Sequence, residues 1–236
     1  MARYTAGVGR VVFLLLAVAM VVCAAEVPSI GCPSDGQVGP MEVPPANTIQ
    51  VPIPEAAARQ LAYYRWTGGI GILAPRGWHC FDRYGSSGDA LMVSAKPLDL
   101  ARGIDGPAVE LNRSIGDTSG RFTVARIAAR VFPSAATFVA DVTREFGVPS
   151  SDYPTGPYPA DSLVYKSRTV VEYRTSAESE GLGTQTLLKK NASPIEGVAI
   201  LTGDSPPDLF LVAIRLPRET AALTRIIVDQ VEREAK

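Results

Sequence analysis

The sequence predicts an α+β fold in which an antiparallel sheet, made of an early hairpin and a C-terminal meander, carries several helices, including a C-terminal one. Three observations support this prediction. Strand-like runs flank a Gly-Ser turn at residues 85–89. Further strand-like runs, separated by turn residues, fill residues 163–217. The chain ends in an amphipathic pattern over residues 218–236. Strands that are grouped, and do not alternate with helices, are typical of α+β proteins.

Residues 1–25 predict a secretory signal peptide. Arg3 and Arg10 precede an unbroken apolar run over residues 11–22, and small residues follow up to Ala25. A basic start, a short apolar stretch and small residues before a cleavage site mark such a peptide. The apolar run is shorter than the roughly 20 residues that cross a bilayer as a helix, which argues against an uncleaved anchor. We expect cleavage near Ala25 and a periplasmic or secreted protein.

The remaining chain divides into a Pro- and Gly-rich segment over residues 26–54 and a single α+β domain over residues 55–236. No later apolar run reaches spanning length, so we expect no stable membrane insertion after signal removal. The 23 basic and 24 acidic residues give a net charge of −1, without a basic patch. We therefore expect no nucleic-acid partner.

Two cysteines remain once the signal peptide, which contains Cys23, is removed. Cysteines of an exported chain usually pair because the compartment is oxidising, so we predict a disulfide between Cys32 and Cys80. In the chain-entropy model, closing this loop contributes about 4 kcal/mol. The bond should also hold residues 26–54 beside the first hairpin, with the two Cα atoms within about 7 Å.

The alternative for Cys80 is a reactive thiol served by His79, the only histidine of the chain. A nucleophilic cysteine needs a base that faces it. Adjacent residues of a strand point to opposite faces of the sheet, so His79 should face away from Cys80. The structural disulfide is the favoured interpretation, and His79 is not expected to be catalytic or to bind a metal.

The first elements after the Pro-rich segment are a helix and a hairpin. Residues 54–69 begin with a proline, carry an acid in the first turn and end in two glycines, which predicts a helix. Residues 70–75 and 78–84 are expected strands, and the Gly-Ser turn leads into a third strand at residues 90–97. The positions expected to point inward are Trp78, Cys80, Leu91 and Val93.

Two helices are predicted in the middle of the chain. Residues 118–133 have a helical pattern that stops at Pro133, although residues 121–132 alternate well enough to form a strand. Residues 134–147 predict a second helix, with Ser134 as its N-cap and a glycine at its end.

A Pro- and Tyr-rich loop at residues 148–162 connects these helices to an antiparallel meander of four strands. The predicted strands cover residues 163–175, 183–190, 197–203 and 208–217. The final helix, over residues 218–236, should pack on this meander through an apolar stripe. The stripe consists of Leu223, Ile226, Ile227 and Val231.

The succession of "APRGWHC", "TSGRF", "ARVFP", "EYRT", "GLGT" and "RLP" before a final helix resembles a group of exported bacterial proteins with no assigned activity. This resemblance covers residues 60–236. The order of hairpin, helices, meander and terminal helix is also similar to PsbP-like α/β/α sandwiches. Proteins of that fold serve as assembly or accessory factors more often than as enzymes, which implies a binding role by analogy. Neither resemblance supplies catalytic residues.

No motif predicts a catalytic, cofactor-binding or metal site. Four aspartates lie near turns, where aspartate is an ordinary turn residue, although such residues can meet in a fold as a carboxylate pair. These are Asp82, Asp89, Asp204 and Asp208. We expect a non-enzymatic binding or accessory factor, without a cofactor, whose partner is an envelope protein or a cell-wall component. The alternative is an exported hydrolase that uses carboxylates or a serine nucleophile.

Overall fold

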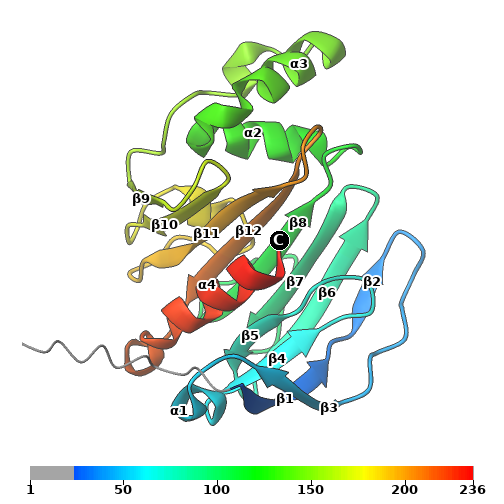
Figure 1. The fold of residues 1–236 in the computed structure, drawn as a ribbon, viewed down its shortest axis with the longest axis vertical. Coiled ribbons are helices and arrows are strands. Elements are labelled where there is room, and N and C mark those ends of the chain that lie inside the picture. The colour runs from blue at the N-terminus through cyan, green and yellow to red at the C-terminus, as the bar shows by residue number, and fades with distance from the viewer. Residues whose placement is uncertain (1–23, 236) are drawn as a thin grey trace, which may run out of the picture.

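The computed structural model describes residues 24–235, which form two β-sheets and four α-helices (Figure 1). The smaller sheet has the strand order β3-β1-β4-β5, and the larger sheet has the order β2-β6-β7-β8-β12-β11-β10-β9. Most strand pairs are antiparallel, so the fold is α+β, as the sequence predicts. Residues 1–23, which hold most of the predicted signal peptide, lie outside the described part of the chain.

The smaller sheet incorporates the Pro- and Gly-rich segment. β1 pairs antiparallel with β3 and parallel with β4, and β4 pairs antiparallel with β5. Residues 26–54 thus supply nearly all of two strands of this sheet. The four strands are β1 (Ala25–Gly31), β3 (Asn47–Val51), β4 (Leu61–Arg65) and β5 (Ile72–Pro75).

The predicted helix over residues 54–69 is wrong beyond its first turn. Helix α1 covers only Glu55–Ala58, and the chain then extends into β4. β4 lies between two other strands and is almost entirely buried, an environment that aromatic and apolar side chains favour. Tyr64 illustrates this, because it is 1 % exposed and its hydroxyl donates to the Pro75 carbonyl at 2.8 Å. Burial in a sheet therefore outweighs the helical start.

The larger sheet joins the predicted hairpin to the predicted meander. β8, which sequence analysis missed, pairs with β7 on one side and with β12 on the other. Only β2, which pairs with β6, is parallel to its neighbour. The eight strands are β2 (Ser34–Gly36), β6 (His79–Gly85), β7 (Gly88–Ser94), β8 (Ala108–Ser114), β12 (Asp208–Arg215), β11 (Ile195–Thr202), β10 (Val170–Thr175) and β9 (Asp161–Tyr165).

The first predicted strand of the meander is a hairpin instead. Residues 163–175 span β9 and β10, which pair antiparallel and turn at residues 166–169. The N–H groups of Lys166 and Ser167 both donate to the Val170 carbonyl and so close the turn. The four consecutive strands from β9 to β12 form the antiparallel meander.

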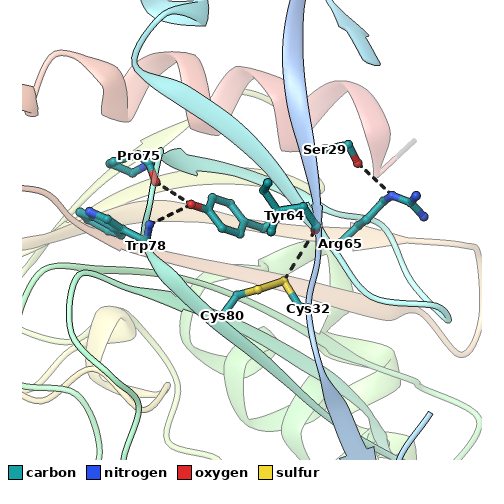
Figure 2. The surroundings of a disulfide bond; sticks show 8 residues. Ser29, Cys32, Tyr64, Arg65, Pro75, Trp78 and Cys80 are labelled. Atoms are coloured by element: carbon teal, nitrogen blue, oxygen red, sulfur yellow. Dashed lines mark hydrogen bonds between the residues drawn. A yellow bond between two sulfur atoms is a disulfide. The ribbon is translucent and has the colours of Figure 1, made fainter. Parts of the chain in front are cut away.

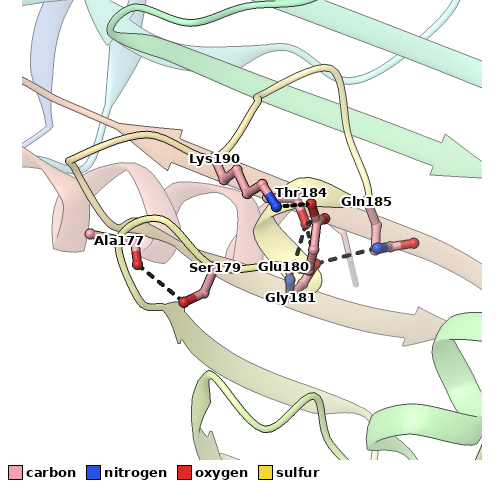
Figure 3. A network of polar contacts seen from close by, with 7 residues as sticks. All are labelled: Ala177, Ser179, Glu180, Gly181, Thr184, Gln185 and Lys190. Atoms are coloured by element: carbon pink, nitrogen blue, oxygen red, sulfur yellow. Dashed lines mark hydrogen bonds and ion pairs between the residues drawn. The ribbon is translucent and has the colours of Figure 1, made fainter.

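The predicted strand over residues 183–190 is also wrong. The segment begins with a 3₁₀ helix at Leu182–Thr184 and is held by a local polar network (Figure 3). The Thr184 hydroxyl donates to Glu180 at 2.9 Å, and Glu180 forms an ion pair with Lys190 at 3.0 Å. Side chains that bond locally compete with the regular pairing of a strand. This competition explains why an alternating pattern does not become a strand here.

Residues 121–132 form a helix and not a strand. Helix α2 covers Arg121–Val131, and Pro133 follows its C-cap as the sequence predicts. Val124 and Ile127 are completely buried against the larger sheet. The apolar face of α2 thus covers one face of that sheet.

Helix α3 (Ala136–Phe146) follows after a 3₁₀ turn at Pro133–Ala135. The predicted cap, Ser134, does not cap it, because its hydroxyl donates to the distant Arg168 carbonyl at 2.8 Å. The predicted end is confirmed. Gly147 has a left-handed conformation with φ of 62°, which glycine adopts without steric cost.

Helix α4 (Leu223–Glu234) and the smaller sheet together cover the other face of the larger sheet (Figure 1). A 3₁₀ turn at Arg218–Thr220 precedes this helix, which therefore starts later than predicted. Leu223 and Ile227 of the predicted stripe are buried in the core shared by both sheets. The final helix therefore packs on the sheet, as the stripe predicts.

Candidate ligand-binding pocket

The disulfide predicted between Cys32 and Cys80 is present, and its two Cα atoms are 5.4 Å apart (Figure 2). Cys32 follows β1 and Cys80 lies in β6, so the bond links the smaller sheet to the larger one. His79 is exposed, as strand alternation requires. The bonded Cys80 offers no thiol nucleophile to the neighbouring histidine.

The surroundings of this bond form a structural network (Figure 2). The Tyr64 hydroxyl accepts the Trp78 N–H at 3.1 Å, and the Arg65 Nε donates to the Ser29 hydroxyl at 2.9 Å. The Cys32 N–H donates to the Arg65 carbonyl at 2.8 Å. These contacts satisfy polar groups between β1, β4 and the start of β6, and they explain the position of the bond without a catalytic role.

The four aspartates that sequence analysis singles out do not form one site. Asp82 and Asp89 lie on the paired strands β6 and β7. Asp208 forms an ion pair with Arg113 at 2.7 Å, and Asp204 is exposed in the turn between β11 and β12. Asp82 lies two residues after the disulfide-bonded cysteine of β6, so its side chain also faces the smaller sheet.

Asp82 and Asp89 form the pair that the hydrolase alternative requires. Burial raises the pKa of the Asp82 carboxyl to about 8, and the charge of Asp89 adds to this effect. Burial also raises the pKa of Asp89 to about 6, against the opposing charge of Arg113. Two carboxyls with different pKa values suit acid–base catalysis. Both oxygens of Asp82 are buried and lack a hydrogen-bond partner, whereas Asp89 lines a pocket of about 380 Å³.

A pocket lies among the helices, on the side of the larger sheet that α2 covers. Residues of α2, α3, the loop at residues 150–157 and Tyr165 line this pocket, which measures about 960 Å³ and is open to solvent, and we call it the α2–α3 pocket. Pockets for small molecules typically measure 300–1,000 Å³ and are mainly apolar. The α2–α3 pocket therefore has the dimensions of a ligand site.

Helix α3 gives the pocket a stripe of small side chains. Ala136, Val139, Ala140 and Thr143 line it at the spacing i, i+3, i+4 and i+7, which places them on one face of the helix. Within α3 only Val142 is buried by the protein. Ala136 and Ala140 of this stripe are exposed, whereas Val139 is half-buried and packs against the neighbouring core.

The opposite walls are also small or apolar. Ala128 and Ala129 come from α2, and Tyr153 and Pro154 come from the Pro- and Tyr-rich loop. Sequence analysis treated this loop as a simple connection, yet it forms one side of the pocket. Alanines on two facing helices keep the space between them open, because short side chains do not interdigitate as a packed core does.

The lining of the α2–α3 pocket contains no aspartate, glutamate, histidine or cysteine among the described residues. Its charged side chains are Arg130 and Arg144. Carboxylates, imidazoles and thiols are the side chains that most often serve as acids, bases or thiol nucleophiles in catalysis, and none of them lines this pocket. The arrangement is suited to binding an apolar molecule.

A smaller pocket of about 380 Å³ lies beside the first turns of α2, against the larger sheet. Arg83, Arg126 and Asn112 line it. The Asn112 amide donates to the buried Glu110 carboxylate at 2.9 Å. Burial raises the pKa of Glu110, against this hydrogen bond and others, including one from the Leu187 N–H. This second pocket is polar, and it differs in chemistry from the α2–α3 pocket.

Residues 24–235 contain no group of three His, Cys, Asp or Glu side chains placed to hold a metal ion, and none of their helices is both long and apolar enough to cross a membrane. The sequence matches no protein-family model, and no curated protein or solved structure matches it. The described residues thus form a two-sheet α+β protein with an apolar pocket between α2 and α3.

The spacing of small residues is the signal in the sequence that points to the pocket. Residues 134–147 are predicted as a helix, and their alanines, valine and threonine repeat on one face. What the sequence does not reveal is the partner of that face. An amphipathic helix is ordinarily assigned to the core, and only the structure shows that this face is turned to an open space.

Proposed function

We propose that this protein is an exported, non-enzymatic binding protein of the cell envelope that holds a small apolar molecule in the α2–α3 pocket. The observation that carries the proposal is an apolar pocket of about 960 Å³ whose lining has no acid, histidine or cysteine. The Cys32–Cys80 disulfide supports the exported location, because such bonds persist in oxidising compartments.

The hydrocarbon part of an envelope lipid fits this chemistry best. Most of the pocket wall is apolar, from alanines of α2 and α3 and from prolines and tyrosines, although hydroxyl groups also line it. These belong to Thr143, Ser150, Ser151 and Thr155. Each buried methylene contributes about 0.8 kcal/mol, which corresponds to about fourfold in affinity. Affinity for straight-chain molecules should therefore rise about fourfold with each added methylene until the pocket is full.

The exported hydrolase is the weaker candidate. Its best evidence is the pair of Asp82 and Asp89, whose pKa values differ. Because the carboxyl oxygens of Asp82 have no accessible surface, only Asp89, which lines the smaller pocket, could contact a substrate, and the two carboxyls could not act on it together.

A fluorescent probe tests the proposal. The neutral apolar dye N-phenyl-1-naphthylamine should bind the exported chain with one site and should be displaced by dodecanol. Ala140→Phe should weaken the binding at least tenfold, because Ala140 is exposed toward the pocket and a phenyl group would occupy the space. The measurement is a fluorescence titration at a dye concentration below the dissociation constant.

Thr137→Phe is the matched control. Thr137 lies in the same helix, is also exposed and does not line the pocket, so this variant should bind the dye as the wild type does. Equal binding by the wild type and Ala140→Phe would contradict the proposal, as would a complete lack of dye binding by the wild type.

A further inference from the structure

Arg130 places a positive charge in the wall of the α2–α3 pocket. It lies in the last turn of α2 and is half-buried. Its guanidinium carbon lies 4.3 Å from the centre of the Tyr158 ring, so the ring holds one face of the group. This contact holds the guanidinium against the Tyr158 ring.

The hydrogen bonds of this guanidinium are incomplete within the described chain. Its Nη1 donates a long hydrogen bond of 3.4 Å to the Gly156 carbonyl, and its Nε is buried without a partner. A guanidinium has five N–H donors, and buried donors are normally satisfied. Because the Nε has no accessible surface, only the two Nη groups can meet a ligand, and within the described chain their one hydrogen bond is the long one to Gly156.

Asp161, an acid that the charge of Arg130 influences, is already engaged elsewhere. Asp161 interacts with the charge of Arg130 at a distance, but its two oxygens accept hydrogen bonds from Thr175 at 2.6 Å and from the Leu182 N–H at 2.9 Å. No ion pair joins Arg130 to any carboxylate of residues 24–235. The guanidinium thus has no anionic partner of its own.

Arg144, the other arginine of the pocket, shows the contrast. It is exposed and forms an ion pair with Asp141 at 2.5 Å, one turn away on α3. The pocket therefore contains one arginine that the protein neutralises and one that it does not. An unpaired cation beside apolar walls favours a ligand that brings both an apolar chain and an anion.

We propose that the ligand of the α2–α3 pocket is an amphiphile with an anionic head group, a carboxylate or a phosphate, that pairs with Arg130 while its hydrocarbon chain lies between α2 and α3. The inference rests on the proposed function, because it concerns the same pocket. A planar guanidinium binds either anion with two parallel hydrogen bonds, and the apolar surroundings strengthen the attraction.

Displacement of N-phenyl-1-naphthylamine by dodecanoate, dodecyl phosphate and dodecanol tests this inference, since the three share one chain and differ in the head group. All are used below their micelle concentrations. One of the two anions should bind the wild type at least tenfold tighter than dodecanol, in line with a charged hydrogen bond. The tighter anion identifies the head group as a carboxylate or a phosphate.

Arg130→Gln should abolish this preference for the anion, and the affinity for dodecanol should stay within about twofold of the wild type. Arg130→Lys should restore part of the preference, because it keeps the charge and loses the planar fork. Arg144→Gln is the matched control from the same pocket and should keep the full preference. The dodecanol affinity reports whether each variant still has an intact pocket.

The outcomes separate the inference from the function on which it rests. If dodecanol binds the wild type as tightly as both anions, or if Arg130→Gln keeps the preference, the acidic ligand is wrong and the apolar pocket stands. If neither the dye nor dodecanol binds the wild type, the proposed function itself is wrong.

Discussion

At the scale of single residues, burial decides the chemistry more than residue type does. Asp82 looks in the sequence like an ordinary turn residue, yet the fold buries it completely and raises its pKa to about 8. Arg130 looks like one of several arginines on a helix, yet no carboxylate of residues 24–235 forms an ion pair with it. The sequence gives the residue type, but the protonation state and the hydrogen-bond partners of the side chain depend on its surroundings in the fold.

The pKa of Asp82 predicts a pH dependence of stability. In the unfolded chain this carboxyl has a pKa near 3.9, so between about pH 4 and pH 8 the folded state binds the extra proton. The free energy of unfolding should therefore fall as the pH rises through this window. Asp82→Asn removes the titrating group and should flatten the decline between pH 6 and pH 8, where the wild type loses a few kcal/mol.

Urea unfolding at several pH values measures this slope. Asp117→Asn is the control, because Asp117 is exposed and its carboxylate makes no hydrogen bond or ion pair in the described chain. It should keep the slope of the wild type. An Asp82→Asn variant with the same slope as the wild type would show that the folded protein holds this carboxyl in its ionised form.

At the scale of elements, sequence patterns predict those that local signals define. The β6–β7 hairpin has a clear turn and α4 a clear stripe, and the structure confirms both, whereas the pattern of residues 121–132 leaves helix and strand open and only the structure shows α2. β4 begins with a helical signal, and only its burial between two strands makes it a strand. β8 is a strand that the sequence analysis missed, because several of its residues are polar. The sequence predicts a strand at residues 183–190, but their side chains bond locally and a 3₁₀ helix begins the segment. The face of α3 is predictable, but the open space that it meets is not.

The position of α4 predicts that it is essential to the core. Ile227 has no exposed surface and lies among residues from both sheets. Ile227→Asp should lower the free energy of unfolding by about 3–5 kcal/mol, because it buries an unpaired charge. Thr224→Asp in the first turn of the same helix should change it by less than about 1 kcal/mol. If Ile227→Asp lowered the free energy of unfolding in chemical denaturation as little as Thr224→Asp does, α4 would not be part of the core.

Gln230 adds a contact that the apolar stripe does not reveal. It is completely buried, accepts the Leu73 N–H at 3.0 Å and donates to the Gly71 carbonyl at 3.2 Å. These bonds satisfy backbone groups at β5, the outer strand of the smaller sheet. Gln230→Leu should cost about 1–3 kcal/mol in thermal or chemical unfolding, because it leaves two buried polar groups unpaired. A neutral effect would show that water satisfies these groups.

The disulfide predicts how the two sheets separate. Because it joins the end of β1 to β6, reduction should release residues 27–54 to proteolysis before the β9–β12 meander is cut. Replacing both cysteines by alanine should lower the free energy of unfolding by about 2–4 kcal/mol. Limited proteolysis with mapping of the fragments by mass spectrometry distinguishes this order from simultaneous cleavage, which would contradict it.

At the scale of the whole molecule, the proposed export predicts where the mature chain begins. Mass spectrometry of the native protein should find an N-terminus at or near Glu26, because the order of residues 1–25 predicts cleavage there. In the structure β1 already pairs at Ala25, so cleavage there leaves the smaller sheet nearly whole. An intact Met1 or a lipid on Cys23 would contradict export by a cleaved signal peptide.

The central claim is that an amphiphile occupies the α2–α3 pocket, and photocrosslinking tests it most directly. A dodecanoate that carries a diazirine near the end of its chain should label residues 128–144 and the loop at residues 150–157, and excess unlabelled dodecanoate or dodecyl phosphate should prevent the labelling. Peptide mapping locates each adduct without a variant that could misfold. Labelling confined to the smaller sheet or to the exposed Phe122 and Phe146, and unaffected by competitor, would contradict the claim.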